Sequence, residues 1–140
     1  MTNKVALIVG AGDSLGSSIA RVFANDGFTV VVARRNGDKL SGLAEEIKKN
    51  GGDCFFYSLD ARKEDDVISL INKIEDEIGE ILVAVYNIGA NIRYGILETT
   101  SRKYYKVWEM AAFGAFLIGR EVAKKMDPRK KWTIIFTGAS

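Results

Sequence analysis

Short apolar runs alternate with stretches of helical periodicity along the whole chain. Five of these runs lack strict alternation of polar and apolar positions, which is typical of strands covered on both faces of a sheet. The predicted strands are Val5–Val9, Thr29–Ala33, Cys54–Tyr57, Ile81–Tyr86 and Thr133–Phe136.

Between the predicted strands, apolar residues recur at the spacing of one helix face. Each of the first three stripes ends before a glycine, a residue that commonly terminates helices. The stripes are Leu15, Ile19, Val22 and Phe23; Leu40, Leu43, Ala44 and Ile47; and Val67, Leu70, Ile71, Ile74 and Ile78. This alternation of strands and helices predicts right-handed βαβ units and a parallel sheet.

The fourth helical segment is the longest and runs from about Ser101 to Met126. It is predicted to end at Asp127-Pro128, because proline disfavours helical geometry in the residue before it. One of its sides carries Trp108, Ala112, Ala115, Gly119, Val122 and Met126. Basic residues gather at its end, which favours a solvated helix terminus over an anion site. These residues are Lys124, Lys125, Arg129, Lys130 and Lys131.

Length and composition narrow the class of protein. The 140 residues are 47% hydrophobic with a formal net charge of +2, which predicts one globular domain, residues 1–140, and excludes disorder. Twenty basic against 18 acidic residues create no global basic field, so nucleic acid is not favoured as a partner. No stretch approaches about 18 uninterrupted apolar residues, so we expect no membrane span.

Histidine and cysteine usage limits the available chemistry. The chain has no histidine, which removes the commonest general base and excludes zinc sites of Cys/His type, so no metal is expected. Its one cysteine, Cys54, lies in an apolar run and cannot form a disulfide within the chain. This favours a core residue in a reducing compartment over a nucleophile, and the expected location is cytoplasmic.

The first predicted strand runs directly into a glycine-rich turn, Gly10-Ala11-Gly12-Asp13-Ser14-Leu15-Gly16, and a predicted helix follows. Such a turn brings backbone N–H groups and a helix N-terminus against a phosphate. Glycine is needed where a Cβ would block the turn or the approaching pyrophosphate. The spacing differs from the common G-x-G-x-x-G fingerprint, because Leu15 stands at its last position. The place of the turn, after the first strand, still predicts a dinucleotide site.

The end of the second predicted strand bears on the choice of dinucleotide. An acidic residue about 20 positions after the turn would bind a ribose 2′-hydroxyl, whereas arginine accommodates a 2′-phosphate. The residues there are Arg34 and Arg35. A charge-assisted contact contributes about 1.5–3 kcal/mol, so we expect NADP (NADPH) to be preferred over NAD by roughly tenfold to a hundredfold. The alternative is that both arginines are solvated surface residues.

Two other classes of doubly wound protein fit less well. A methyltransferase would want an acidic residue where Arg34 and Arg35 stand. A phosphoreceiver domain would need paired acids near the end of the first strand, and Asp13 alone does not provide them.

The same residues form part of a pattern that resembles the short-chain dehydrogenase/reductase family over essentially the whole chain. The glycine turn is similar to that family's Thr-Gly-x-x-x-Gly-x-Gly turn, with Ser14 in place of the middle glycine. Leu59-Asp60-Ala61 matches the position after strand three, Tyr86-Asn87-Ile88-Gly89 resembles the Asn-Asn-Ala-Gly motif closing strand four, and Gly114-Ala115-Phe116 suits the long helix that follows. The resemblance implies a Rossmann-like doubly wound α/β fold with strand order 3-2-1-4-5, incomplete relative to the family.

The resemblance also implies which residues contact the dinucleotide. The turn residues Gly10, Gly12, Asp13, Ser14, Leu15 and Gly16 would lie around the phosphates, and Arg34 and Arg35 at the 2′-phosphate. Asp60 and Ala61 would contact the adenine, and Asn87 and Gly89 the ribose region. Structural alternatives are that Asp60 caps the helix beginning near Glu64 and that Gly89 only serves a turn.

The catalytic residues that the resemblance implies are largely absent. The family uses a Tyr with a Lys four residues later, together with a Ser and usually an Asn. No Tyr-x-x-x-Lys occurs in the sequence, and Ala111 stands where the Asn is expected. Ser140 is the candidate for the catalytic serine. We therefore expect a chain truncated after strand five, before the segment that would carry the Tyr and Lys.

Two functions remain open. One is a short-chain oxidoreductase that binds NADP(H) and acts on an unknown carbonyl compound or alcohol. The other is an NADP-binding module without redox chemistry, which Ser14 and Ala111 favour because truncation would not explain them. The apolar fifth strand would form an exposed edge, which promotes association. Pairing through the long helix resembles the family's usual dimer contact, so we expect a homo-oligomer (dimer or tetramer).

Overall fold

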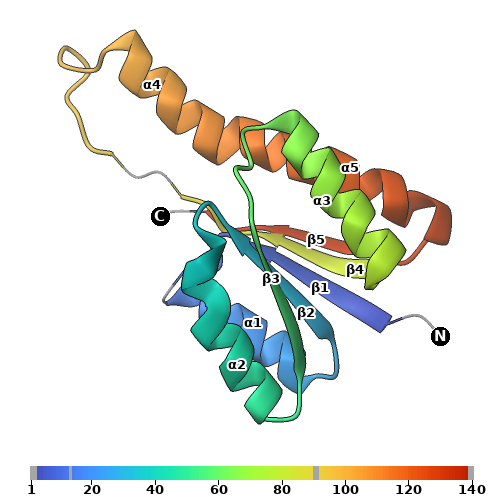
Figure 1. The fold of residues 1–140 in the computed structure, drawn as a ribbon. Helices are drawn as coiled ribbons and strands as arrows, with labels where there is room; N and C mark the ends of the chain where they lie inside the picture. The colour runs from blue at the N-terminus through green and yellow to red at the C-terminus, as the bar shows by residue number, and fades with distance from the viewer. Residues whose placement is uncertain (1–2, 13, 90–91, 139–140) are drawn as a thin grey trace.

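The computed structural model of the protein describes residues 3–12, 14–89 and 92–138. Its main elements are β1 (Asn3–Val9), α1 (Leu15–Asn25), β2 (Thr29–Arg34), α2 (Ser41–Lys49), β3 (Asp53–Ser58), α3 (Glu64–Glu77), β4 (Gly79–Tyr86), α4 (Ser101–Trp108), α5 (Gly114–Met126) and β5 (Thr133–Phe136). The strands form one parallel sheet of order β3-β2-β1-β4-β5. Helices α1 and α2 cover one face, α3 and α5 lie on the other, and α4 projects past the end of the sheet (Figure 1). The Rossmann-like doubly wound fold and its strand order are therefore confirmed.

The central strand β1 sends alternate side chains into two separate cores. Val5, Leu7 and Val9 pack with residues of α3 and α5, whereas Ala6 and Ile8 pack with residues of α1 and α2. All five are essentially inaccessible to solvent. Because both faces are covered, the strand is a continuous apolar run rather than an alternating one.

The edge strand β5 is much more open. Ile135 and Phe136 are 41% and 53% exposed, on a strand whose outer edge no other described strand pairs. The expected apolar edge is therefore confirmed.

The predicted helical segment from Ser101 to Met126 is confirmed in its extent, but it is not α-helical throughout. A π-helical turn, Glu109–Phe113, separates α4 from α5. The turn contains extra residues relative to an α-helix and so rotates the buried face of α5 relative to α4. Val122 and Met126 of the predicted stripe are consequently buried, whereas Trp108 and Ala112 are exposed.

The predicted stripe of α1 is also only partly buried. Leu15 and Val22 are 55% and 64% exposed, and the residues that are buried on this helix are Gly16, Ser17 and Ala20. These small residues face the sheet and let the helix pack close to the strands. Leu15 and Val22 lie outside this contact and stay exposed.

The basic cluster at the end of α5 serves the fold. Lys124 pairs with Glu121 and Lys130 with Asp127. Arg129 is a partly buried exception to the expected solvated terminus, because it pairs with Glu75 and donates to the Ile81 carbonyl. Arg129 thus ties this helix end to α3 and β4, whereas the Lys124 and Lys130 pairs are local.

Two further expectations can be compared with the structure. Cys54 is fully buried in β3, and burial raises the pKa of its thiol to about 11, which supports a core residue rather than a nucleophile. No helix in the described part of the chain is long and apolar enough to cross a membrane.

Candidate dinucleotide site

The carboxyl ends of β1, β2 and β4 border an open groove of about 590 Å³. It lies where the strand order reverses on either side of β1, the position at which open α/β sheets bind ligands. Its lining comes from the turn after β1, the connection after β2, the end of β4 and the π-helical turn. The lining residues are Gly10, Gly12, Arg34, Arg35, Asn36, Lys39, Asn87, Ile88, Gly89 and Met110.

The glycine turn is locked to its neighbours at Gly10. This residue has a φ of +90°, and a Cβ there would lie 2.5 Å from the backbone oxygen of Asn87. Its N–H donates to the Ala33 carbonyl at 2.8 Å. At Gly16, a Cβ would lie 2.5 Å from the Gly10 carbonyl oxygen, so α1 begins in direct contact with the turn. Both glycines are required by close packing of the backbone.

Gly12 and Gly89 differ from these two, because a Cβ at either position would meet nothing within 4 Å. Both line the groove. The first amides of α1 beside the turn have no partner within the helix, as at every helix N-terminus. Ser14 is the N-cap residue, but its hydroxyl makes no capping hydrogen bond. Open space at the Cα of Gly12, next to a helix N-terminus, fits a pyrophosphate.

Three cationic side chains line the β2 side of the groove. Arg34 ends β2, Arg35 follows it, and Lys39 comes from the 3-10 helix Gly37–Leu40. The sequence interpretation missed Lys39. Its signal was available, because it is a third cation within the same short connection between β2 and α2.

Asn87 joins three segments beneath the groove. Its backbone N–H donates to Val9 at 2.8 Å and its side-chain amide donates to the Gly10 carbonyl at 3.2 Å. Its side-chain oxygen accepts a hydrogen bond from the Thr137 hydroxyl at 2.8 Å. The side chain therefore holds the ends of β1, β4 and β5 together, and contact with the ribose stays a prediction.

Tyr86 connects the end of β4 to the π-helical turn. It is 2% exposed, and its hydroxyl donates to the Met110 carbonyl. Burial raises the pKa of Tyr86 to about 12, so the hydroxyl keeps its proton at neutral pH. A Cβ at Gly114 would collide with this hydroxyl. The contact positions Met110 on the groove wall, a lining residue for which the sequence gives no signal.

Five predicted contact residues do not line the groove: Ser14, Leu15, Gly16, Asp60 and Ala61. Asp60 accepts two side-chain hydrogen bonds from Arg62, which lower the pKa of the carboxyl to about 2. It does not cap α3, whose N-cap is Lys63. Ala61 is buried in the core. Asp13 and Ser140 lie outside the described residues.

Comparisons with known proteins agree with this geometry. The short chain dehydrogenase family model matches residues 4–140. A solved short-chain dehydrogenase from Rhodopseudomonas palustris is 44% identical with a TM-score of 0.93, and the match covers 99% of this chain and 65% of that chain. A solved actinorhodin polyketide ketoreductase with NADPH is 25% identical with a TM-score of 0.90, over 96% of this chain and 52% of that chain.

A curated relative shows the same similarity. The 2-dehydro-3-deoxy-D-gluconate 5-dehydrogenase of Formosa agariphila is 30% identical over 133 residues, which make up 94% of this chain and 50% of that protein. The chain spans about half the length of the curated relatives it matches. The family match over nearly the full chain, together with the sheet order and the glycine turn, shows that the protein belongs to the short-chain dehydrogenase family.

Proposed function

We propose that the groove binds NADP(H), and that the chain is the nucleotide-binding part of a short-chain oxidoreductase that interconverts a carbonyl compound and an alcohol. One observation carries the proposal. The glycine turn at the start of α1 and the cations Arg34, Arg35 and Lys39 line the same open groove.

The cations favour a cofactor with a 2′-phosphate. In doubly wound folds an acid at the end of the second strand binds the ribose 2′-hydroxyl, and arginine accommodates the added phosphate. Arg34 and Arg35 occupy that position, and Lys39 adds a third positive charge to the same wall. The similarity to a ketoreductase solved with NADPH supports this choice.

The described residues suit binding and orientation more than proton transfer. A bound nicotinamide would supply or accept a hydride, while the substrate oxygen needs a separate proton donor. The sequence contains no Tyr-x-x-x-Lys, and Ala111 in the π-helical turn cannot donate a hydrogen bond from its side chain. The described residues of this chain therefore suit the dinucleotide rather than the proton-transfer step.

Ala111 also supports a second candidate function, an NADP-binding module without redox chemistry. The family resemblance implies an asparagine at this position, and alanine there removes a polar group from the wall beside the groove. The two functions are separated by hydride transfer. A module would bind NADPH tightly in the intact protein and reduce no carbonyl compound.

We extend the proposal to a homo-oligomer, dimer or tetramer, in the cytoplasm. Tyr105 and Phe116 are 59% and 54% exposed on α4 and α5, and β5 presents an apolar edge. Large exposed apolar side chains of this kind mark interaction surfaces. The single buried Cys54 is consistent with a reducing compartment.

An equilibrium titration with NADPH and with NADH tests the main proposal. We expect saturable binding with NADPH preferred by at least about tenfold. Arg34→Ala and Lys39→Ala are expected to weaken the binding of NADPH much more than the binding of NADH. Lys131→Ala removes the same charge from an exposed position outside the groove and serves as the matched control. Binding of neither dinucleotide, or equal losses for both in the arginine variant, would contradict the proposal.

A further inference from the structure

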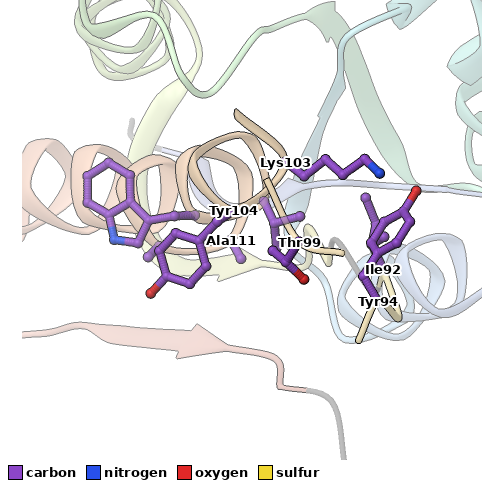
Figure 2. Close-up of a pocket in the computed structure, with 9 residues that line it drawn as sticks. Ile92, Tyr94, Thr99, Lys103, Tyr104 and Ala111 are labelled. Carbon is purple, nitrogen blue, oxygen red and sulfur yellow. The ribbon is translucent and has the colours of Figure 1, made fainter. Parts of the chain in front are cut away.

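A second cavity, of about 380 Å³, lies between α4 and the segment that precedes it. Figure 2 shows Tyr104 and Ala111 on one side of it and Ile92, Tyr94 and Lys103 on the other. Its volume is in the range of small-molecule pockets, roughly 300–1,000 Å³, near the lower limit. A cavity of this size suits a compound with one or two rings.

The cavity and the dinucleotide groove are neighbours across the π-helical turn. Met110 of this turn lines the groove, and the next two residues, Ala111 and Ala112, line the cavity. A compound that exchanges hydride with a nicotinamide must lie beside the dinucleotide. The cavity therefore occupies a suitable place for the substrate, and the two alanines leave room for it.

Aromatic side chains dominate the lining. Tyr94, Tyr104 and Trp108 are 49%, 68% and 41% exposed, and all three border the cavity. Aromatic rings pack against other flat rings in offset or edge-to-face arrangements. Three half-exposed rings around one hollow thus favour a ligand that carries an aromatic ring.

Lys103 adds a positive charge to the same cavity. Its ammonium lies 3.9 Å from the centroid of the Tyr94 ring, and it is the one charged side chain among the described residues that line the cavity. No carboxylate in the described part of the chain forms an ion pair with it. A cation beside aromatic rings favours a ligand with an acidic group.

We propose that this cavity holds the substrate, and that the substrate is an aromatic ketone or aldehyde, or the matching alcohol, with an acidic substituent directed at Lys103. The proposal rests on the dinucleotide function proposed above. Tyr105 and Phe116 do not line the cavity, although the centroid of the Tyr105 ring lies 5.5 Å from that of Trp108, which does.

Two ketones of similar size test the proposal by ligand-observed NMR with the protein saturated with NADPH: 4-acetylbenzoate and neutral 4-methylacetophenone. We expect 4-acetylbenzoate to bind at least about fivefold more tightly, since a charge-assisted contact is stronger than an apolar one. Lys103→Met is expected to remove this difference. Lys106→Met, an exposed position on the same helix that does not line the cavity, is expected to preserve it.

Filling the cavity gives a second, independent readout. Ala112→Leu is expected to abolish binding of both ketones while NADPH affinity stays within about twofold, and Ala123→Leu on α5 controls for an added side chain outside the cavity. Ketone binding that survives Ala112→Leu, or no saturable ketone binding in a protein that binds NADPH, overturns the inference and leaves the proposed function standing. An Ala112→Leu variant that dissociates an oligomer instead identifies the cavity as a subunit contact and also overturns it. Failure to bind NADPH overturns the proposed function itself.

Discussion

Two glycine-lined cavities lie at opposite ends of the sheet and differ in what their glycines do. The cavity at the amino ends of β2 and β3 measures about 350 Å³ and includes Gly27, Gly51 and Gly52. Gly27 and Gly51 both have a φ of +89°, a conformation that glycine supplies at the ends of helices. The charged residues there, Arg21 and Glu46, form an ion pair with each other.

The groove at the carboxyl ends has the opposite character. Helix α1 begins there, so the positive end of its dipole faces the groove, whereas α1 and α2 both end at the other cavity. Gly10 in the groove also has a positive φ, but Gly12 and Gly89 do not. A Cβ at Gly12, Gly89, Gly27 or Gly51 would meet nothing within 4 Å, so the backbone conformation is what distinguishes the two pairs. A glycine beside a helix N-terminus that has no positive φ is therefore better evidence of a bound ligand than a glycine whose positive φ is needed for a turn.

The sharpest contrast lies within the glycine turn itself and gives the largest expected effect. Gly10→Ala places a Cβ against the Asn87 backbone at a positive φ, so it should destabilise the fold by about 3 kcal/mol in urea denaturation. Gly12→Ala should change stability by less than about 0.5 kcal/mol and weaken NADPH at least about tenfold by obstructing the groove. A Gly12→Ala protein that binds NADPH normally would refute the assignment of this glycine.

The link from β4 to the π-helical turn should give the next largest effect. Gly114→Ala collides with the Tyr86 hydroxyl and should cost about 2 kcal/mol. Tyr86→Phe leaves the Met110 carbonyl without its donor and should cost about 1–2 kcal/mol. Phenylalanine at position 86 removes the colliding oxygen. The destabilisation of the double variant should therefore be about 1 kcal/mol smaller than the summed destabilisations of the two single variants. Strict additivity in this cycle would show that the two residues do not meet.

A pH titration should give a smaller effect at Asp60. Its folded-state pKa of about 2 lies below the usual value near 3.9, because Arg62 stabilises the ionised carboxyl. The contribution of the Asp60–Arg62 pair to folding stability is therefore present above about pH 4 and is lost as the pH falls toward 2. Partial exposure of the pair limits this contribution to about 1 kcal/mol. Asp60→Asn should be less stable than the parent at pH 7 and nearly equal to it at pH 2. A difference that does not vary with pH would contradict the role of Arg62.

The smallest effect is expected at the opposite end of the sheet. Arg21→Gln breaks the exposed pair with Glu46 and should leave NADPH affinity unchanged within about twofold. The charge change matches that of an Arg34→Gln variant, which serves as the positive comparison. A similar loss of NADPH affinity in both variants would remove the distinction between the two cavities.

The sequence predicts the sheet and the glycine turn well for identifiable reasons. Val5–Val9 and Thr29–Ala33 are continuous apolar runs because both of their faces are buried, so their pattern reports their position directly. Gly10, Arg34 and Arg35 follow the ends of those strands and must meet at one edge of a parallel sheet. All three residues line the groove.

Other features depend on contacts that leave no local pattern. The π-helical turn forms where Tyr86, distant in sequence, hydrogen bonds to Met110, and no proline or glycine marks it within Glu109–Phe113. Met110 could therefore not be predicted as a groove residue. Leu15 belongs to a stripe with the helical spacing of core residues. It is nevertheless exposed, because the small residues of α1 are the ones that face the sheet.

The most direct test of the central claim is to locate the nucleotide by amide NMR, using adenosine 2′,5′-bisphosphate and adenosine 5′-monophosphate. We expect shifts at Gly12, Arg35, Lys39 and Gly89, with the bisphosphate bound at least about tenfold more tightly and no shifts at Gly27 or Gly51. Shifts centred on Gly27 and Gly51, or equal affinity for the two nucleotides, would contradict it.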